Sequence, residues 1–219
     1  MSTLTGPAIL AAMKAGKIKI EPFDPKLVNP HSVDLHLGNT LKVYSTGLPG
    51  SGMYPRYSHD NNPNKRHPRG WDPWKREAFG FIDSKFPPGI VDVPLEPIPT
   101  RPDELGWFLY PDVLYLGATM ESTETRGFRP VLDGRSSTGR LGAFMHITAG
   151  YGDNGFKGHW TLEIAVIEPL ILYPGQRLLQ ISYETLEGEQ TFYGETGNSS
   201  GTYQDQVAEP IASKSSLGG

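Results

Sequence analysis

Apolar and polar positions alternate along several short stretches of the chain, and turn residues separate these stretches. The stretch 33–37, which reads Val-Asp-Leu-His-Leu, has the alternation of a half-buried strand. Further strands are predicted at 17–20, 106–110, 113–116, 142–148, 161–167, 170–173 and 177–183. Short strands with regular turn signals between them predict an all-β domain, either a barrel or a jelly roll.

Three parts of the chain depart from this strand pattern. Residues 5–16 carry a capping threonine, an early proline, helix formers and a final glycine, and therefore predict one short helix. Residues 45–76 lose periodicity and fill with Gly, Pro, Asn and His, so we expect a loop insertion there. Residues 187–219 are polar and end in Ser and Gly, which predicts a mobile tail. A single domain over residues 1–219 accommodates all of these parts.

Charge and composition narrow the function classes. The formal net charge of -4 argues against a nucleic-acid or membrane-surface binder, because both need a dominant basic field. No apolar run approaches the roughly 20 residues of a membrane span, and no signal-type segment opens the chain, so we expect a cytoplasmic protein. The chain has no cysteine, so it lacks the Pro-Cys-x-x-Cys run of the zinc deaminases and every thiolate zinc site.

The stretch 133–142 reads Asp-Gly-Arg-Ser-Ser-Thr-Gly-Arg-Leu-Gly. It places two guanidinium groups, adjacent hydroxyls and flexible backbone amides close together, and these are the groups that bind a polyphosphate. The same residues also fit an Arg/Ser turn at the start of a helix, in which the hydroxyls cap backbone amides. The residues alone leave both interpretations open.

A second candidate stretch covers residues 146–164. A glycine-rich bend carries Asp153, and Glu163 follows between the apolar Leu162 and Ile164. A carboxylate on a buried strand face needs a partner and suits a general acid or base. On the solvent face of the strand, the same carboxylate would be an ordinary surface group. The alternation is compatible with either face.

The run 134–163 resembles the central region of the dCTP deaminase family, with Arg-Ser-Ser-x-x-Arg-Leu-Gly, a Thr-Ala-Gly hairpin and a Thr-Leu-Glu strand. Residues 17–38 and the turn and strand 173–180 are similar to two further family blocks, in the family's order. The resemblance covers most of the chain outside residues 45–105. It implies a distorted jelly roll of the dUTPase type with a short N-terminal helix, assembled as a homotrimer that shares three active sites between subunits.

The resemblance also implies roles for individual residues. Glu163 would be the general acid/base that activates water for attack at C4 of cytosine, with Ser136, Arg140 and the backbone at Ala149 holding the water and the base. The remaining substrate-binding residues would be Arg135 and Ser137 for phosphate, Asp153 for the sugar 3′-hydroxyl, Thr161, Leu162 and Gln180 for base and sugar, and Tyr193 and Gln206 in the tail. No residue would ligate a metal, and Mg²⁺ would come only with the substrate triphosphate.

The tail departs from the family pattern. Family members resemble one another there in a Lys-Tyr-x-Gly-Gln segment, and this chain reads Thr202-Tyr203-Gln204-Asp205-Gln206. One positive charge is lost and one negative charge is added near the expected phosphates.

The implied function is zinc-independent deamination of a deoxycytidine nucleotide, with dCTP as the expected partner and dUTP as the product. Gly150 followed by Tyr151 resembles the bifunctional members that continue to dUMP, whereas Gly152 departs from both groups at a usually apolar position. Two alternatives stay open. One is a dUTPase of the same fold, which uses an aspartate to activate water at the α-phosphate. The other is a non-catalytic nucleotide-binding jelly-roll protein.

Overall fold

The computed structural model describes residues 2–44, 89–111, 113–195 and 201–214. Internal contacts divide the chain into two compact units, residues 1–43 with 92–211 and residues 44–91 with 212–219. All the candidate site residues belong to the first unit. The expected insertion at 45–76 lies outside the described residues, and the single-domain organisation with a mobile tail stays a prediction.

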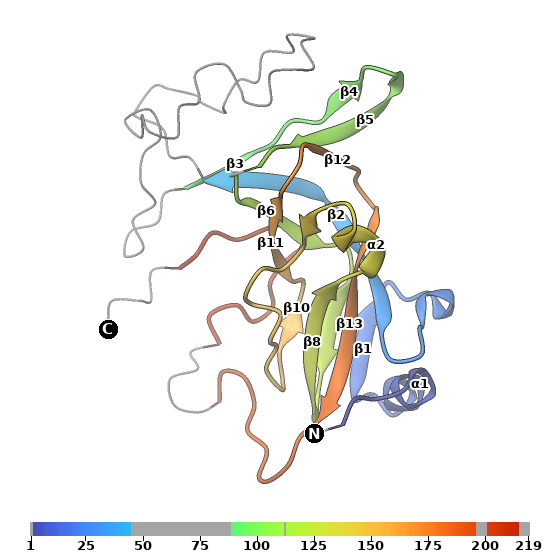
Figure 1. The fold of residues 1–219 in the computed structure, drawn as a ribbon. Helices are drawn as coiled ribbons and strands as arrows, with labels where there is room; N and C mark the ends of the chain where they lie inside the picture. Colours follow the sequence, from blue (N-terminus) through green and yellow to red (C-terminus); the bar gives the residue numbers. More distant parts are fainter. Residues whose placement is uncertain (1, 45–88, 112, 196–200, 215–219) are drawn as a thin grey trace. The chain divides into compact units, whose positions relative to one another are not determined.

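Strands dominate the described residues, and the short N-terminal helix is present, so the predicted all-β class is confirmed (Figure 1). The helices are α1 (Gly6–Lys14) and α2 (Ser136–Gly139), with a 3-10 turn at Pro25–Leu27. The strands are β1 (Ile18–Glu21), β2 (Val33–Tyr44), β3 (Ile90–Asp92), β4 (Glu96–Ile98), β5 (Arg101–Leu109), β6 (Tyr115–Thr119), β7 (Ser122–Thr125), β8 (Phe128–Gly134), β9 (Ala143–Phe144), β10 (Lys157–Gly158), β11 (Thr161–Val166), β12 (Leu170–Leu172) and β13 (Arg177–Thr185). Among the described helices, none combines the length and the apolar character needed to cross a membrane.

The central sheet is antiparallel and follows the order β8-β13-β2-β6-β11-β9, and it curls into a nearly closed barrel. Two smaller sheets, β1-β7-β10 and β12-β5-β4, accompany it. Leu35, Leu37, Leu162, Ile164 and Ile181 are among the side chains packed inside the barrel, and each is 0% exposed. This order brings β11 and β13, which carry much of the candidate site, into one continuous sheet.

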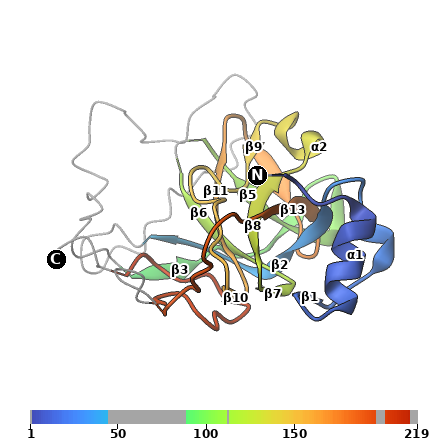
Figure 2. The same cartoon turned by 90° about the horizontal axis from the view of Figure 1, so that it is seen from below.

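Helix α1 forms where the capping pattern predicts it. The Thr5 hydroxyl accepts a hydrogen bond from the Ala8 amide at 3.4 Å, and Gly16 lies just beyond the helix with φ +70°. A left-handed residue at this position suits glycine, which ends the helix. Ile9 is fully buried, and Figures 1 and 2 both show α1 beside β1.

Strand β13 contains an irregularity that its sequence explains. The register with β2 shifts between Arg177 and Leu179, and the adjacent Leu178 and Leu179 are both buried. A regular strand would send two successive side chains to opposite faces, so the bulge allows both leucines to enter the core. After the bulge the ordinary alternation returns, with Ile181 and Tyr183 buried, and burial raises the pKa of the Tyr183 phenol.

Several sequence expectations need correction. The stretch 33–37 is not half-buried, because Asp34 is only 2% exposed, and its carboxylate pairs with polar partners described below. The strand expected at 142–148 is reduced to β9, since the residues after Phe144 leave the sheet. The pattern also missed β7 and β8. Strand β7 is built from Ser, Thr and Glu, and β8 contains Pro130, which an edge strand tolerates because it needs fewer amide donors.

Candidate active site

The phosphate-type motif begins where β8 ends. Arg135 is the N-cap residue of α2, and Ser136 and Ser137 form the exposed first turn of this four-residue helix. A short helix begins at this motif, as the turn interpretation expects, and its N-cap residue Arg135 makes no side-chain capping hydrogen bond. Arg140 follows the helix and is also exposed. The motif thus presents hydroxyl and guanidinium groups at the molecular surface.

Asp34 holds Arg135 in place. The Arg135 Nε atom lies 3.2 Å from Asp34 Oδ2, and Arg177 Nε lies 3.5 Å from the same oxygen. The Asn29 side-chain amide donates to Asp34 Oδ1 at 2.8 Å. The Asp34 side chain is only 3% exposed, so this carboxylate is a buried anchor for two cations. One carboxylate against two guanidinium groups leaves a net positive charge, which favours an anionic ligand.

Gln180 joins the same group from β13. Its Nε2 atom donates to the Gly134 carbonyl at 3.2 Å, and its Oε1 accepts from the Ser32 hydroxyl at 3.2 Å. The register pairs Gln180 with Asp34 on one side and with Asp133 on the other. Sequence analysis did not place Asp34, Arg177 or Ser32 in the site. The available signal was that Asp34 and Arg177 lie within blocks that carry the family resemblance.

Glu163 lies on β11, on the face opposite the core. Leu162 and Ile164 are 0% exposed, whereas the Glu163 side chain is 29% exposed. Alternation therefore puts the carboxylate on the outer face of a single chain, partly covered. The Leu162 side chain is committed to the core, so any contact of this residue with a substrate would fall to its backbone.

His146 is the partner of Glu163. Its Nδ1 atom forms a short hydrogen bond with Glu163 Oε2, and its side chain is only 3% exposed. A histidine that binds a carboxylate through one ring nitrogen has a defined ring orientation and a favoured proton position. Sequence analysis missed this residue as a functional group, although it stands at the start of the glycine-rich stretch that was singled out.

The tail docks beside Glu163. Thr161 shares the outer face of β11 with Glu163, and its hydroxyl accepts hydrogen bonds from Gln206 Nε2 and, at 3.2 Å, from the Ile211 amide. The Gln206 carbonyl accepts from the His159 amide at 2.9 Å. A Cβ on Gly158 would lie 2.6 Å from the Gln206 amide nitrogen, so this close approach needs glycine. The predicted residues Thr161 and Gln206 are thus in direct contact.

One of the two departures in the tail, Asp205, has a local structural setting. Asp205 has a positive φ of 56°, the conformation that a family glycine would adopt without strain. Its carboxylate pairs with Lys157 Nζ at 3.1 Å, and the side chains are 67% and 54% exposed. The added negative charge therefore has a cationic neighbour, although an exposed pair contributes at most about 1 kcal/mol.

Asp153 and Tyr193 lie at a cavity of about 240 Å³. Tyr193 packs edge-on against Phe156, with ring centroids 6.0 Å apart, and its hydroxyl accepts from the Tyr203 amide at 3.1 Å. The cavity wall also contains Arg129 and Tyr151. The predicted sugar-binding aspartate therefore shares one cavity with Tyr193 of the tail.

Close packing around residue 152 accounts for the glycine there, which departs from the family pattern. A Cβ at this position would lie 2.4 Å from the Trp160 ring and 2.9 Å from the Pro130 carbonyl oxygen. The Trp160 side chain, which is 7% exposed, therefore fills the space that an apolar side chain at 152 would need. A large residue at 160 and a glycine at 152 are a matched pair.

Gly150→Ala is expected to lower kcat/KM for the proposed reaction by about 100-fold, because a displacement of about 1 Å can cost that much. The added Cβ would lie 2.2 Å from the Leu132 carbonyl oxygen, so the segment next to Ala149 and Asp153 must move. Steady-state kinetics would measure the loss. The melting temperature of the variant checks that it is still folded. Unchanged kinetics in Gly150→Ala would contradict the assigned position of this segment.

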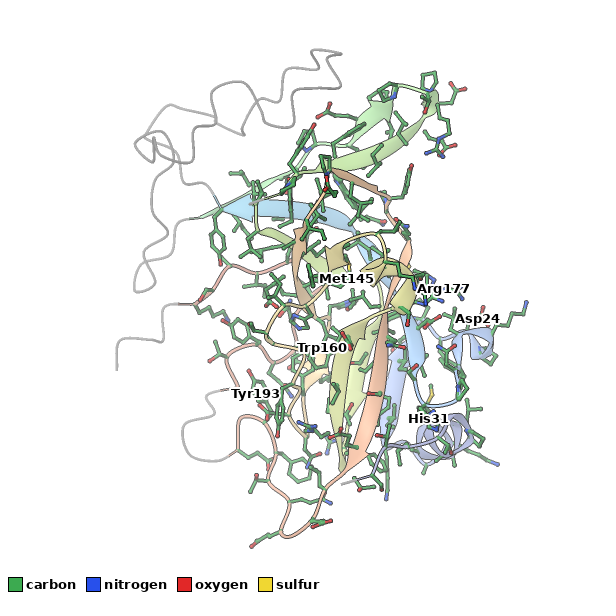
Figure 3. All side chains as sticks on the ribbon, viewed as in Figure 1. Asp24, His31, Met145, Trp160, Arg177 and Tyr193 are labelled. Carbon is green, nitrogen blue, oxygen red and sulfur yellow. The ribbon has the colours of Figure 1, made fainter. Side chains whose placement is uncertain are left out.

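Within one chain, the predicted residues form two groups. Arg135, Ser136, Ser137, Arg140 and Gln180 gather around α2 and the start of β13, and Glu163, Thr161, Gln206, Asp153 and Tyr193 gather around β11 and the tail. Figure 3 shows Arg177 and Tyr193, one from each neighbourhood, on opposite sides, with Trp160 between them. Glu163 hydrogen-bonds His146 rather than Ser136 or Arg140. Ala149 is exposed in the loop between β9 and β10.

The chain is an all-β protein with a barrel-like sheet, and its guanidinium, hydroxyl and carboxylate groups suit a nucleotide ligand. More particularly, the chain belongs to the dCTP deaminase-like family, whose model matches residues 3–186. The family resemblance seen in the sequence is therefore confirmed.

Known proteins named for one activity are similar to this chain over most of its length. A "dCTP deaminase, dUMP-forming" of Leptospira biflexa is 42% identical over 201 residues, which is 92% of this chain and 89% of that protein. A protein of the same name from Clostridium beijerinckii is 38% identical over 204 residues, 92% of this chain and 90% of that protein.

A solved structure supports the fold. The 2′-deoxycytidine 5′-triphosphate deaminase from Agrobacterium tumefaciens matches with a TM-score of 0.51 and 24% identity over 84% of this chain. This chain spans about half of that protein, 48% of its length. The match concerns the fold alone.

Proposed function

We propose that this protein deaminates dCTP and continues to dUMP, releasing ammonia and pyrophosphate. The observation that carries the proposal is the Glu163–His146 pair on the outer face of β11, next to the docked tail, in a chain 42% identical to a dUMP-forming dCTP deaminase. The overall conversion takes up two waters. One replaces the amino group at C4, and the other cleaves the bond between the α- and β-phosphates.

Glu163 is the proposed general base. Its carboxylate takes a proton from water, the water oxygen attacks C4 of cytosine, and the proton is then delivered to the departing amino nitrogen, which leaves as ammonia. His146 would keep the carboxylate oriented, since it already binds one carboxylate oxygen. Ser136 and Arg140 would hold the water and polarise the base, because a hydroxyl and a guanidinium stabilise developing negative charge.

Arg135 and Ser137 would bind the phosphates, supported by the buried Asp34 that fixes the Arg135 guanidinium. Asp153 would accept a hydrogen bond from the sugar 3′-hydroxyl, and Tyr193 and Gln206 would close the pocket from the tail. Mg²⁺ would reach the site bound to the triphosphate, because it prefers phosphate oxygens and water. The groups around α2 are guanidinium and hydroxyl donors, which fit phosphate oxygens.

We also propose that the protein works in the cytoplasm as a homotrimer in which one subunit's α2 group completes the β11 group of another. The division of the predicted residues into two groups on one chain supports this assembly. Large apolar side chains around β9 and β11 are exposed, which is typical of an interface. They are Leu141 at 52%, Phe144 at 54%, Ile147 at 51% and Ile167 at 62%.

A product assay tests the proposed function. Purified protein incubated with dCTP and Mg²⁺ should release ammonia and pyrophosphate in equal amounts, with dUMP as the nucleotide product. Accumulation of dUTP without pyrophosphate would indicate that the reaction stops after deamination. Pyrophosphate release from dUTP, with no ammonia from dCTP, would favour a dUTPase. Nucleotide binding without any turnover would favour a non-catalytic protein. The last two outcomes would reject the deaminase proposal.

A further inference from the structure

Arg129 and Tyr151 form a contact beside the predicted sugar site. The Arg129 guanidinium carbon lies 4.1 Å from the centroid of the Tyr151 ring. Tyr151 is 66% exposed, so it is a surface aromatic residue, and the Arg129 guanidinium packs against its ring. Cation–π contacts of this kind contribute about 0.5–2 kcal/mol.

Glu184 holds the Arg129 side chain. Arg129 on β8 lies directly across from Glu184 on β13, and both Nε, at 2.9 Å, and Nη2 of Arg129 donate to Glu184 Oε2. The two side chains are 17% and 24% exposed. Burial acts to lower the pKa of Arg129, whereas its hydrogen bonds with Glu184 and Tyr151 raise it, and the net direction is upward. The guanidinium is therefore a charged, oriented group.

The backbone around Tyr151 pairs with the outer edge of β8. The Leu132 amide donates to the Gly150 carbonyl at 2.9 Å, and the Gly152 amide donates to the Pro130 carbonyl at 2.9 Å. Tyr151 itself pairs with Val131 as an isolated antiparallel bridge. Two backbone hydrogen bonds at a sheet edge give limited stability, so a side-chain contact can decide how firmly this segment is held.

We propose that Arg129 is a positioning residue that, through the ring of Tyr151, holds the segment 149–153 against β8. This inference rests on the proposed function and deepens it. Ala149 precedes Tyr151 by two residues and Asp153 follows by two, and these carry the proposed contacts to the base and the sugar. Arg129 and Tyr151 also line the same cavity as Asp153. The Glu184–Arg129–Tyr151 chain therefore connects β13 to the sugar-binding side of the site.

Hydrogen–deuterium exchange tests the inference without any need for activity. In Arg129→Gln and in Tyr151→Leu, the amides of Leu132 and Gly152 should exchange about tenfold faster than in the wild type. Tyr151→Phe keeps the ring but loses the hydroxyl, so its amides should exchange more slowly than those of Tyr151→Leu. Arg126→Gln is the matched control, because Arg126 is an exposed arginine that pairs with Glu124 of strand β7. Wild-type exchange in both Arg129→Gln and Tyr151→Leu would overturn the inference.

Kinetics with dCTP provide the second readout. Arg129→Gln and Tyr151→Leu should each raise KM about tenfold while kcat stays within about threefold, because binding geometry is lost and the acid/base group is intact. The double variant should be no worse than the poorer single variant, since both changes break one contact. Multiplicative losses in the double variant, or a fall in kcat at constant KM, would contradict the inference. A wild-type enzyme with no turnover would reject the proposed function, and the exchange experiment would still decide the role of Arg129.

Discussion

Glu163→Gln should lower kcat for dCTP deamination by about 10²- to 10⁴-fold, the usual contribution of a general acid/base. The amide is nearly isosteric with the carboxylate and can still hydrogen-bond His146, so the fold should survive. What is lost is the capacity to take a proton from water and return it to the leaving nitrogen. Ammonia release under saturating dCTP measures the effect, and the melting temperature confirms that the variant is folded.

Glu168→Gln is the matched control for this variant. Glu168 is an exposed carboxylate just after β11 and should keep wild-type rates. Pyrophosphate release from dUTP should be followed in parallel, because a dUTPase of this fold would not need Glu163. If deamination persists at the wild-type rate in Glu163→Gln, the proposed general base is wrong. If the wild type releases only pyrophosphate from dUTP, and Glu163→Gln releases it at the same rate, the result favours the dUTPase alternative.

Asp34→Ala should destabilise the protein by about 2 kcal/mol and also raise KM for dCTP. Removing one partner of a fully buried ion pair costs about 3–5 kcal/mol, and the smaller figure applies because Arg135 and Arg177 are 26% and 44% exposed. The two cations would then repel each other, and Asn29 would lose its acceptor. For a chain of this size, a fall in melting temperature of about 4–8 °C is expected.

Two further variants make this result specific. Asp34→Asn keeps the size and one acceptor but loses the charge, so it should be less destabilised than Asp34→Ala. Glu104→Ala removes the carboxylate partner of Arg101 from a pair in which both side chains are about half exposed, at 51% and 50%, and should cost less than about 1 kcal/mol. Equal melting temperatures for Asp34→Ala and Glu104→Ala would show that Asp34 is not a buried anchor.

The sequence predicted those parts of the fold in which apolar alternation and local signals agree. Helix α1 has its threonine cap and its terminal glycine, and β11 and β13 have apolar residues at the expected spacing. Strand β7 was missed because its buried residues, Thr123 and Thr125, are polar and have no hydrophobic signal. Asp34 was misplaced because its burial depends on Asn29 and two arginines, and a strand pattern contains no information about such partners.

In the candidate site too, the sequence predicted individual residues but not the contacts between residues far apart in the chain. Motif resemblance pointed to Arg135, Ser136 and Glu163, and the structure puts Thr161 and Gln206, which the resemblance also implied, in contact. The Glu163–His146 pair joins residues 17 positions apart, and the Asp34–Arg135 pair joins β2 to the start of α2. Such pairs follow from strand register and loop path, which single-sequence patterns do not specify. The roles of the site residues stay predictions until the variants are measured.

The regular alternation that follows the bulge in β13 makes this part of the strand intolerant of changes in length. Because side chains alternate, deleting Gln180 would place Leu179 next to Ile181 and send one of them to the opposite face of the sheet. Either Leu179 would leave the interior, or Ile181 and Tyr183 would turn outward. In a library of variants selected for folded protein, single substitutions along β13 should therefore survive more often than single-residue insertions or deletions.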